Sequence, residues 1–351
     1  MKIALISPLP PPEGGIATWT KEATSYFADN AIQFKLINNA VVGKRKDRIT
    51  AATSVRDELV RTNRILKELK ATLDSFEPDL LHINTSCGRF GIYRDYLCIL
   101  IAKKKSIPCI LHCHCNVRDQ LHSSFAEYIF KLMVQMSAEV LVLNRSTQEY
   151  VKQHTQHDSI LVPNFIDTHG KEEINKMIKD SMQDVLFVGH IQKTKGCNEI
   201  IETARRCPKI RFTLVGPIGS EYDQLNFPSN VRTVGKKKHA EVEEYMHEAD
   251  VFLFPSYTEG FSNALLEAMM NGLPVVASDV GANRDMLEDK GGIIIPIQDV
   301  DAIVCALDLL EKVEIRKSMS DWNVRKVRNS YTKGYVMGRI TDIYRKTLIR
   351  G

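Results

Sequence analysis

The chain has 351 residues, which is enough for two domains of ordinary size, each with its own hydrophobic core. Hydrophobic residues make up 44% of the sequence and charged residues 26%, as in a soluble globular protein, and no apolar run approaches the roughly 20 residues of a membrane-spanning helix. The net charge of +4 comes with no basic stripe interleaved with aromatic residues, so we expect no nucleic-acid partner. The start MKIALISPLPPP does not resemble a signal peptide, and we expect a cytoplasmic protein.

Positive charge is concentrated in the first half of the chain. Residues 1–165 contain 21 Lys and Arg against 16 Asp and Glu, whereas the remainder contains 26 against 27. Basic clusters occur at 44–48 and at 103–105. They are either solvated loops and helix ends, or part of a surface that rests on anionic lipid, where each cation contributes about 1 kcal/mol. The second interpretation predicts a peripheral protein on the inner face of the cell membrane.

Eight cysteines are scattered through apolar segments, which is typical of reduced core thiols and not of a disulfide framework. One cluster, His112-Cys113-His114-Cys115, has the residue types of a zinc site. In a strand, however, alternate side chains point to opposite faces, so these four could not converge on one metal ion. We therefore expect no metal there.

The first half of the chain alternates strands and helices, which predicts a parallel sheet covered by helices. We expect strands at 2–7, 32–38, 79–84, 108–114 and 139–143, and helices at 16–28, 55–76, 93–103, 124–137 and 147–154. After the first strand, Gly14 and Gly15 would let the backbone approach a phosphate or a sugar, although two glycines in a proline-rich loop more often only turn the chain. Neither G-x-G-x-x-G nor G-x-x-x-x-G-K-[ST] is present, which argues against a dinucleotide oxidoreductase or a P-loop NTPase.

The second half has the same alternation. We expect a helical linker after a boundary near Thr168, and then strands at 185–188, 211–216, 231–235, 251–256 and 274–278. Helices are expected from 197, at 241–249 and 263–270, and from Asp299, with charged helices over 312–349. Between 279 and 298, DVGANRDMLED is expected to form a turn and a helix, and GGIIIPI a strand.

The segment Asp250–Gly281 carries two carboxylates in one strand-turn-helix-strand unit. Glu259 lies in the turn, and Glu267 shares a helical stripe with Asn263, four residues earlier. Ser262 is a good N-cap, so the amide groups and the positive dipole of a helix start face the same space. Amides suit phosphate and carboxylates suit hydroxyls, so the unit predicts a site for a phosphorylated, polyhydroxylated ligand. The alternative is an ordinary buried unit with a carboxylate at each end.

The sequence EGFSNALLEAMMNG resembles the E-x(7)-E segment of retaining GT-B glycosyltransferases of family 4, and VPNFID and FVGHIQKTKG resemble two further segments of that family. The resemblance implies an α/β fold of the GT-B type, with two Rossmann-like doubly wound domains that face a central cleft. We expect an acceptor-side domain at 1–168, onto which the last helix at about 332–351 crosses back, and a nucleotide-sugar-binding domain at 169–331. The family's lysine and glycine match Lys195 and Gly196, but its arginine is replaced by His190. Lys193 is the other candidate for that charge.

The resemblance also assigns roles. Glu259 would orient the transferred sugar, Lys195 would stabilise the leaving diphosphate, and His114, where the strand at 108–114 ends, would lie near the sugar. Donor contacts are further expected from Gly14, Gly15, His190, Gly260, Phe261, Ser262, Asn263 and Glu267. The implied reaction transfers a sugar, with retention, from a nucleotide sugar to a hydroxyl of a glycan, or lipid-linked glycan, of a bacterial surface polysaccharide. No cofactor is expected, and because no D-x-D motif is visible and fixed cations face the diphosphate, no metal is expected either.

Two alternatives share the fold and the donor. One is a GT-B nucleotide-sugar epimerase, which needs no acceptor. The other is a non-catalytic nucleotide-sugar-binding protein, which the replacement of the arginine by His190 would suit. Whether the donor is a UDP-, GDP- or ADP-sugar stays open.

Overall fold

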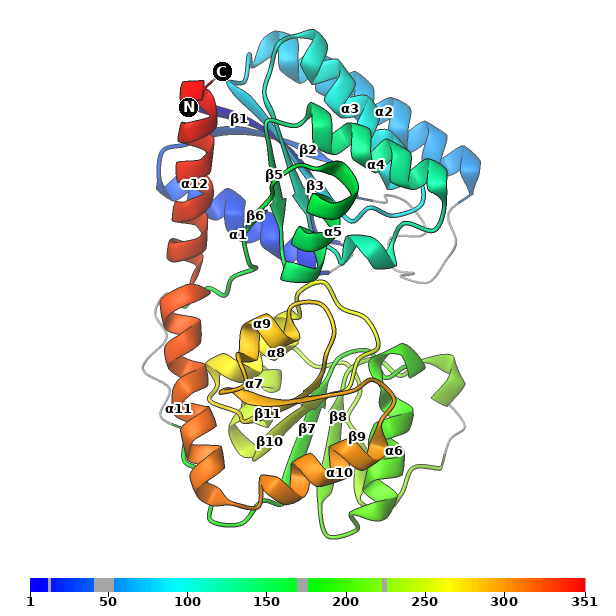
Figure 1. Ribbon diagram of the computed structural model, residues 1–351, viewed down its shortest axis with the longest axis vertical. Coiled ribbons are helices and arrows are strands. Elements are labelled where there is room, and N and C mark those ends of the chain that lie inside the picture. Colours follow the sequence, from blue (N-terminus) through cyan, green and yellow to red (C-terminus); the bar gives the residue numbers. More distant parts are fainter. Residues whose placement is uncertain (12–13, 41–53, 169–175, 223–225, 351) are drawn as a thin grey trace. The chain divides into compact units, whose positions relative to one another are not determined.

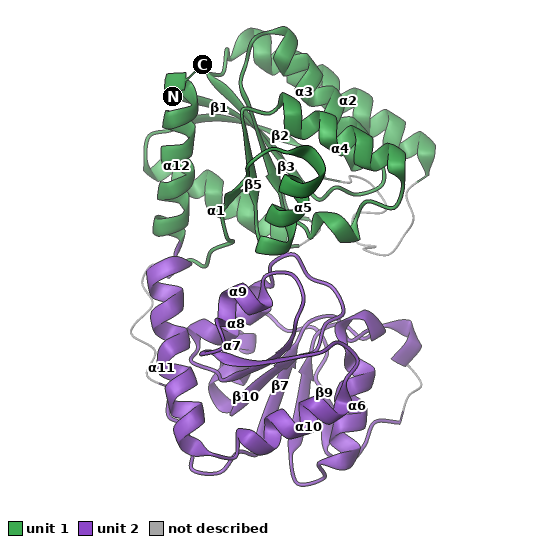
Figure 2. Ribbon diagram, in the orientation of Figure 1, with its two compact units in different colours: residues 1–167, 333–351 green, residues 168–332 purple. Residues whose placement is uncertain are grey.

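The computed structural model describes residues 1–11, 14–40, 54–168, 176–222 and 226–350. The chain forms two compact units: residues 1–167 together with 333–351, and residues 168–332 (Figures 1 and 2). Within the described residues, no helix combines the length and the apolar character needed to cross a membrane.

Unit 1 is a six-stranded parallel sheet in the order β2-β1-β3-β4-β5-β6. The strands are β1 (Lys2–Ser7), β2 (Gln33–Asn38), β3 (Leu80–Thr85), β4 (Cys109–Cys113), β5 (Glu139–Val142) and β6 (Ile160–Leu161). The helices are α1 (Gly15–Asp29), α2 (Val55–Ser75), α3 (Gly91–Lys104), α4 (Ser124–Met136), α5 (Arg145–Thr155) and α12 (Lys333–Arg350), with a 3-10 turn at Val117–Asp119.

Both faces of this sheet are buried, as expected of parallel strands that are covered by helices. On β1, Ala4 and Ile6 join a core cluster with residues of α2, α3, α4 and α5. Ile3 and Leu5 join a second cluster, which α1 and α12 cover. Figure 1 shows α12 and α1 on the side of the sheet away from α2, α3 and α4.

Unit 2 is a second six-stranded parallel sheet, in the order β12-β11-β10-β7-β8-β9. Its strands are β7 (Asp184–Val188), β8 (Arg211–Val215), β9 (Val231–Thr233), β10 (Val251–Phe254), β11 (Val275–Ser278) and β12 (Gly292–Ile295). Its helices are α6 (Cys197–Arg206), α7 (His239–Glu248), α8 (Asn263–Met270), α9 (Asn283–Leu287), α10 (Val300–Leu309) and α11 (Val313–Ser330), with 3-10 turns at Lys193–Lys195 and Ser220–Tyr222.

A buried arginine fixes α11 to the rest of unit 2. The guanidinium of Arg316 is completely buried and donates to the carbonyl oxygens of Leu310, Lys179 and Asp180 at 2.7, 2.8 and 3.0 Å. Hydrogen bonds from a charged donor contribute more than those between neutral groups. Arg316 therefore anchors the start of α11 to the segment that leads into β7.

The predicted α/β class with two doubly wound domains is confirmed, and the expected elements agree with the structure to within a few residues. Two details differ. β4 ends at Cys113, so His114 follows the strand instead of ending it, and β6, only two residues long, was not predicted. The basic cluster at 44–48 lies outside the described residues, as does the first part of the helical linker expected after Thr168. The described part of that linker, residues 176–183, contains no helix, so the prediction of a helix is wrong there.

Candidate functional site

The strand order of unit 2 identifies where a ligand should bind. From β7 the chain proceeds outward through β8 and β9, then returns to β10 on the other side of β7 and proceeds through β11 and β12. The loops after β7 and β10 therefore diverge at the carboxyl ends of two neighbouring strands. In open parallel sheets such a switch point is where ligands bind.

These two loops carry Lys195 and Glu259, and the structure brings the two side chains together. The ammonium of Lys195 donates to Oε1 of Glu259. The ammonium also lies 5.7 Å from the ring centroid of Phe254, the last residue of β10. The Lys195 side chain is 25% exposed and that of Glu259 11%, so the pair is partly accessible to a ligand.

Close packing of the loops explains why a glycine follows this lysine. Gly196 has φ +75°, and a Cβ added there would lie 2.1 Å from the carbonyl oxygen of Pro255. Next to this contact, the amide of Tyr257 donates to the carbonyl of Thr194 at 2.9 Å. A side chain at position 196 would push the loops apart and separate Lys195 from Glu259.

The turn after Glu259 is held by its neighbours on both sides. Ser262 caps α8 by accepting from the amide of Leu265 at 3.2 Å. Phe261 is buried, and its ring meets that of Tyr331 edge to face at 5.7 Å. The Gly260 carbonyl accepts from the amide of Ala282 at 3.1 Å. These contacts fix the turn in place. The side chains of Phe261 and Ser262 make packing and capping contacts within unit 2, and the backbone of the turn leads into the start of α8.

Glu267 lies on α8, one turn beyond Asn263. A ring nitrogen of His239, at the start of α7, lies 3.9 Å from Oε1 of Glu267. The His239 side chain is largely exposed, and its other ring nitrogen lies 3.5 Å from Glu243. His239 was not predicted from the sequence, and it places a titratable group next to the expected ribose-binding carboxylate.

His190 follows β7 in a positively charged environment. Burial, and then the charges of Lys195 and Lys236, lower the pKa of His190 below its usual 6.5. In the unliganded protein this side chain is therefore neutral at pH 7. Lys193 has an exposed side chain, and Lys236, beyond β9, is a further cation that the sequence did not indicate.

Unit 1 has its own switch point, between β1 and β3, and a cavity of about 390 Å³ lies there. Gly14 and Gly15 line it together with Pro8, Ile16, Ala17, Asn39, Ala40, Arg61, Asn84, Ser86 and Arg94. The structure thus places the two glycines at a cavity formed by the loops after three neighbouring strands. Gly14 precedes α1 and makes no side-chain cap, so the first turn of α1 opens directly onto this space.

His114 belongs to a buried polar network next to this cavity. Its Nε2 lies 3.0 Å from Oδ1 of Asn84, which also lies 2.9 Å from Nε2 of His82. Burial lowers the pKa of His114 to about 3, so the ring is neutral at physiological pH. His112 and Trp19 pack against the same ring, with centroids 4.0 and 5.3 Å away.

The two cysteines of the cluster lie on the other face of the sheet. Cys113 and Cys115 pack into the core cluster that contains Cys87, whereas the histidines contact Trp19. Among the described residues, no three His, Cys, Asp or Glu side chains are grouped so that they could hold a metal ion.

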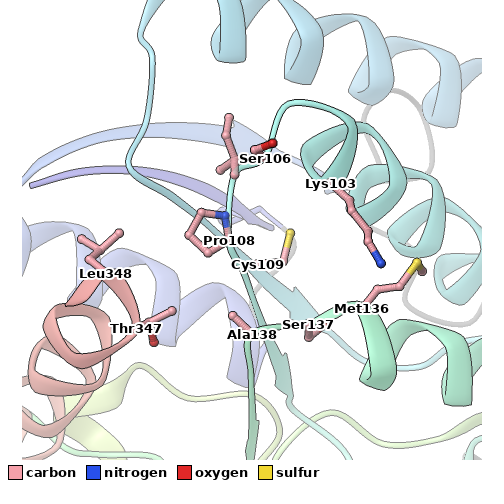
Figure 3. Close-up of a pocket in the computed structure, with 10 residues that line it drawn as sticks. Lys103, Ser106, Pro108, Cys109, Met136, Ser137, Ala138, Thr347 and Leu348 are labelled. Carbon is pink, nitrogen blue, oxygen red and sulfur yellow. The ribbon is translucent and has the colours of Figure 1, made fainter. Parts of the chain in front are cut away.

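A second cavity in unit 1, of about 340 Å³, lies at the opposite edge of the sheet. It is lined by residues before β4 and β5 and at the end of α12, among them Lys103, Pro108, Ala138 and Leu348 (Figure 3). Ligands of parallel sheets bind at the carboxyl ends of the strands, and this cavity is at the amino ends. It is therefore not the candidate site.

Arg61 and Arg94 were not predicted from the sequence either. Both line the cavity between β1 and β3, from α2 and α3. Arg94 could have been noticed from the sequence, because it lies in the first turn of α3, where the helix dipole disfavours a cation. Such a residue suggests a partner outside the helix.

Sequence comparisons agree with this architecture. Residues 13–169 match the family described as Glycosyltransferase Family 4, and residues 170–326 match Glycosyl transferases group 1. TuaC of Bacillus subtilis, named as a teichuronic acid biosynthesis glycosyltransferase, is 27% identical over 72% of this chain and 66% of its own length. The chain belongs to the GT-B glycosyltransferases of the family 4 type.

Solved structures share the fold. Sucrose-phosphate synthase from Thermosynechococcus elongatus superposes over 100% of both chains with a TM-score of 0.79 and 16% identity. HepE from Anabaena, in complex with UDP and glucose, superposes over 98% of this chain and 99% of its own with a TM-score of 0.70 and 15% identity. At these identities the likeness concerns the fold alone.

The environment of His190 predicts that binding of a nucleoside diphosphate is coupled to proton uptake. The pKa of His190 is lowered in the free protein, and a bound diphosphate would raise it, so affinity for UDP should increase as the pH falls from 7.5 to 5.5. Calorimetric titration in two buffers of different ionisation enthalpy measures the protons taken up. His190→Asn should remove that uptake, and His247→Asn, on the exposed face of α7, should not. Equal proton uptake in the wild type and His190→Asn would contradict this assignment.

Proposed function

We propose that this protein is a retaining, metal-independent glycosyltransferase that transfers a sugar from a nucleotide-sugar donor to a hydroxyl of a glycan. The observation that supports this most strongly is the contact between Lys195 and Glu259 at the switch point of unit 2. The contact joins a cation that suits a diphosphate and a carboxylate that suits sugar hydroxyls. Both belong to segments that resemble the donor-binding motifs of the family.

The pair suggests how the donor would be bound. In the free protein Lys195 and Glu259 neutralise each other. A donor would exchange this contact for two others: the ammonium would contact the diphosphate, and the carboxylate would accept hydrogen bonds from the sugar. Glu267 would hold the ribose hydroxyls, and the backbone from Phe261 to Asn263, with the positive end of α8, would face the phosphates.

The reaction then breaks the bond between the anomeric carbon and the diphosphate oxygen. The acceptor hydroxyl attacks from the same face, and its proton passes to the leaving phosphate, so the anomeric configuration is retained. Lys195 and a protonated His190 stabilise the charge that develops on the diphosphate. Glu259 orients the sugar and is not the nucleophile. The family resemblance suggests substrate contacts for Gly14, Gly15 and His114 as well.

We further propose that the acceptor is a lipid-linked glycan of a bacterial surface polysaccharide and that unit 1 binds an anionic membrane. The name of TuaC supports the polysaccharide. On α4, Phe125 and Tyr128 are 61% and 56% exposed, and Lys131, three residues further along the same strip, is exposed as well. Aromatic residues beside a cation on one helix face suit the interface of an anionic bilayer.

Donor turnover tests the proposed function directly. With UDP-, GDP- and ADP-sugars as candidate donors, we expect transfer or slow donor hydrolysis with one of them, and full activity in excess EDTA. Lys195→Ala should lower kcat/KM by about 10²–10³, because a fixed charge on the leaving group is lost. Lys209→Ala, an exposed lysine before β8, is the control.

Several results of this assay would contradict the proposal. Loss of activity in EDTA that Mn²⁺ restores would exclude a metal-independent enzyme, and a product with inverted anomeric configuration in NMR spectra would exclude retention. Conversion of the donor to an epimer without acceptor would identify an epimerase. Stoichiometric donor binding without any turnover would identify a binding protein.

Liposome flotation tests the membrane contact. The wild type should bind vesicles that contain anionic lipid, and this binding should weaken as salt is raised from 50 to 500 mM. Phe125→Ser/Tyr128→Ser should weaken binding at least fivefold, because two apolar anchors are lost. Ile349→Ser, which removes an 85% exposed side chain from α12, should have no effect. Equal binding to neutral and anionic vesicles, or equal binding of all variants, would contradict a role for this surface.

A further inference from the structure

Tyr257 joins the loop after β10 to the part of the chain that carries Lys195. Its hydroxyl donates to Oε1 of Glu199 at 2.8 Å, and its amide donates to the carbonyl of Thr194 at 2.9 Å. Thr194 belongs to the same 3-10 turn as Lys195, and Glu199 lies in the first turn of α6, the next helix along the chain. Tyr257 therefore contacts the chain on both sides of Lys195.

Glu199 is a buried carboxylate that needs this hydroxyl. It is 8% exposed, and its Oε2 is buried without a hydrogen-bond partner among the described residues. The positive end of the α6 dipole favours a carboxylate in this turn, but a buried charge still requires hydrogen bonds. Burial raises the pKa of Tyr257, so its hydroxyl keeps the proton that it donates to Glu199. The same hydroxyl also hydrogen-bonds the side chain of Gln298, which precedes α10.

The loop after β10 is held on its other side by the turn after β11. The carbonyl of Gly260 accepts from the amide of Ala282 at 3.1 Å. Gly281 has φ +55°, and a Cβ added there would lie 2.3 Å from the carbonyl oxygen of Glu259, so the two loops are in close contact. Glu259 therefore lies between two fixed points, this turn and Tyr257.

A second tyrosine makes the same kind of contact with the neighbouring residue of α6. The hydroxyl of Tyr222 donates to Oδ1 of Asn198 at 2.6 Å. Tyr222 ends the 3-10 turn Ser220–Tyr222, which carries none of the candidate site residues. Both hydroxyls thus hold a loop against the first turn of α6, and of the two loops the one at Tyr257 carries Glu259. Tyr222 is therefore a matched comparison for Tyr257.

We propose that Tyr257 is a positioning residue, which through Glu199 sets the place of Glu259 relative to Lys195. When the hydroxyl is lost, the loop after β10 is held less firmly to α6, so Glu259 contacts the sugar of the donor less often. Lys195 is not part of this loop, so its contact with the diphosphate is retained. The effect on the donor rests on the proposed function, whereas the placement of the loop does not.

Hydrogen exchange of backbone amides, followed by NMR, tests the placement of the loop without any ligand. Tyr257→Phe removes the hydroxyl and keeps the ring. The amide at position 257, which donates to the carbonyl of Thr194, should then exchange at least tenfold faster than in the wild type, because the loop opens more often. Tyr222→Phe removes the hydrogen bond to Asn198 and should leave this amide unchanged. Equal exchange of the amide in the wild type and in Tyr257→Phe would overturn the proposal.

Calorimetric titration with a nucleotide sugar and with its free nucleoside diphosphate tests the effect on the donor. In the wild type the sugar should add to the affinity. Tyr257→Phe should reduce this advantage at least fivefold and lower kcat, while the affinity for the free diphosphate stays within twofold because Lys195 is retained. Glu199→Gln, which keeps an oxygen that can accept from the hydroxyl, should stay within twofold of the wild type in all three quantities, and so should Tyr222→Phe.

Thermal unfolding separates positioning from a general loss of stability. Tyr257→Phe and Tyr222→Phe each remove one buried or half-buried hydrogen bond, so both should lower Tm by similar amounts. An equal loss of the sugar advantage in the two variants, or no loss in either, would contradict a positioning role for Tyr257. The proposed function fails separately, if the sugar adds nothing to the affinity of the wild type and no donor is turned over. The exchange of the amide at position 257 then still decides whether Tyr257 places the loop.

Discussion

The ion pair between Lys195 and Glu259 is the interaction on which this account depends. It exists because β7 and β10 are neighbours although 62 residues of chain separate Val188 from Val251, and because Gly196 allows the loop after β7 to press against Pro255. The pair keeps two charges partly buried without a ligand, since each compensates the other. The ion pair also holds both side chains in place. A bound phosphate and sugar would contact one side chain each and so separate the pair.

Unit 1 shows the same solution at its own switch point. Arg61 and Arg94 are held by Glu58 and Asp95 at the edge of a cavity, as Lys195 is held by Glu259. In each unit a carboxylate stabilises a cation at the carboxyl edge of a parallel sheet. The two units differ in one respect: Glu259 is partly exposed and can itself contact a ligand, whereas Glu58 and Asp95 are not among the described residues that line the cavity of unit 1. The pair in unit 2 therefore offers both a cation and a carboxylate to a ligand.

Much of the fold could be predicted from the sequence, because buried parallel strands are continuous apolar runs and the helices between them are amphipathic. β6 was not predicted, because a strand of two residues shows no periodicity. Among the candidate site residues, Glu259 and Glu267 were predicted from a local pattern and Lys195 from the family resemblance. Arg61 and Arg94 lie 33 residues apart on separate helices, and they line one cavity because α2 and α3 pack against each other, which no local pattern specifies. The partner of Lys195 likewise emerged only with the strand order.

The most direct test of the central claim compares affinities for UDP and for the UDP-sugar, or for the corresponding pair of another base, in Glu259→Gln and Lys195→Met. Glu259→Gln removes the negative charge that pairs with Lys195, so UDP should bind as tightly as to the wild type or more tightly, while the advantage that the sugar adds to binding should disappear. Lys195→Met should weaken both ligands. Equal weakening of UDP and the UDP-sugar by Glu259→Gln, or no effect of Lys195→Met on either, would show that this ion pair is not the donor site.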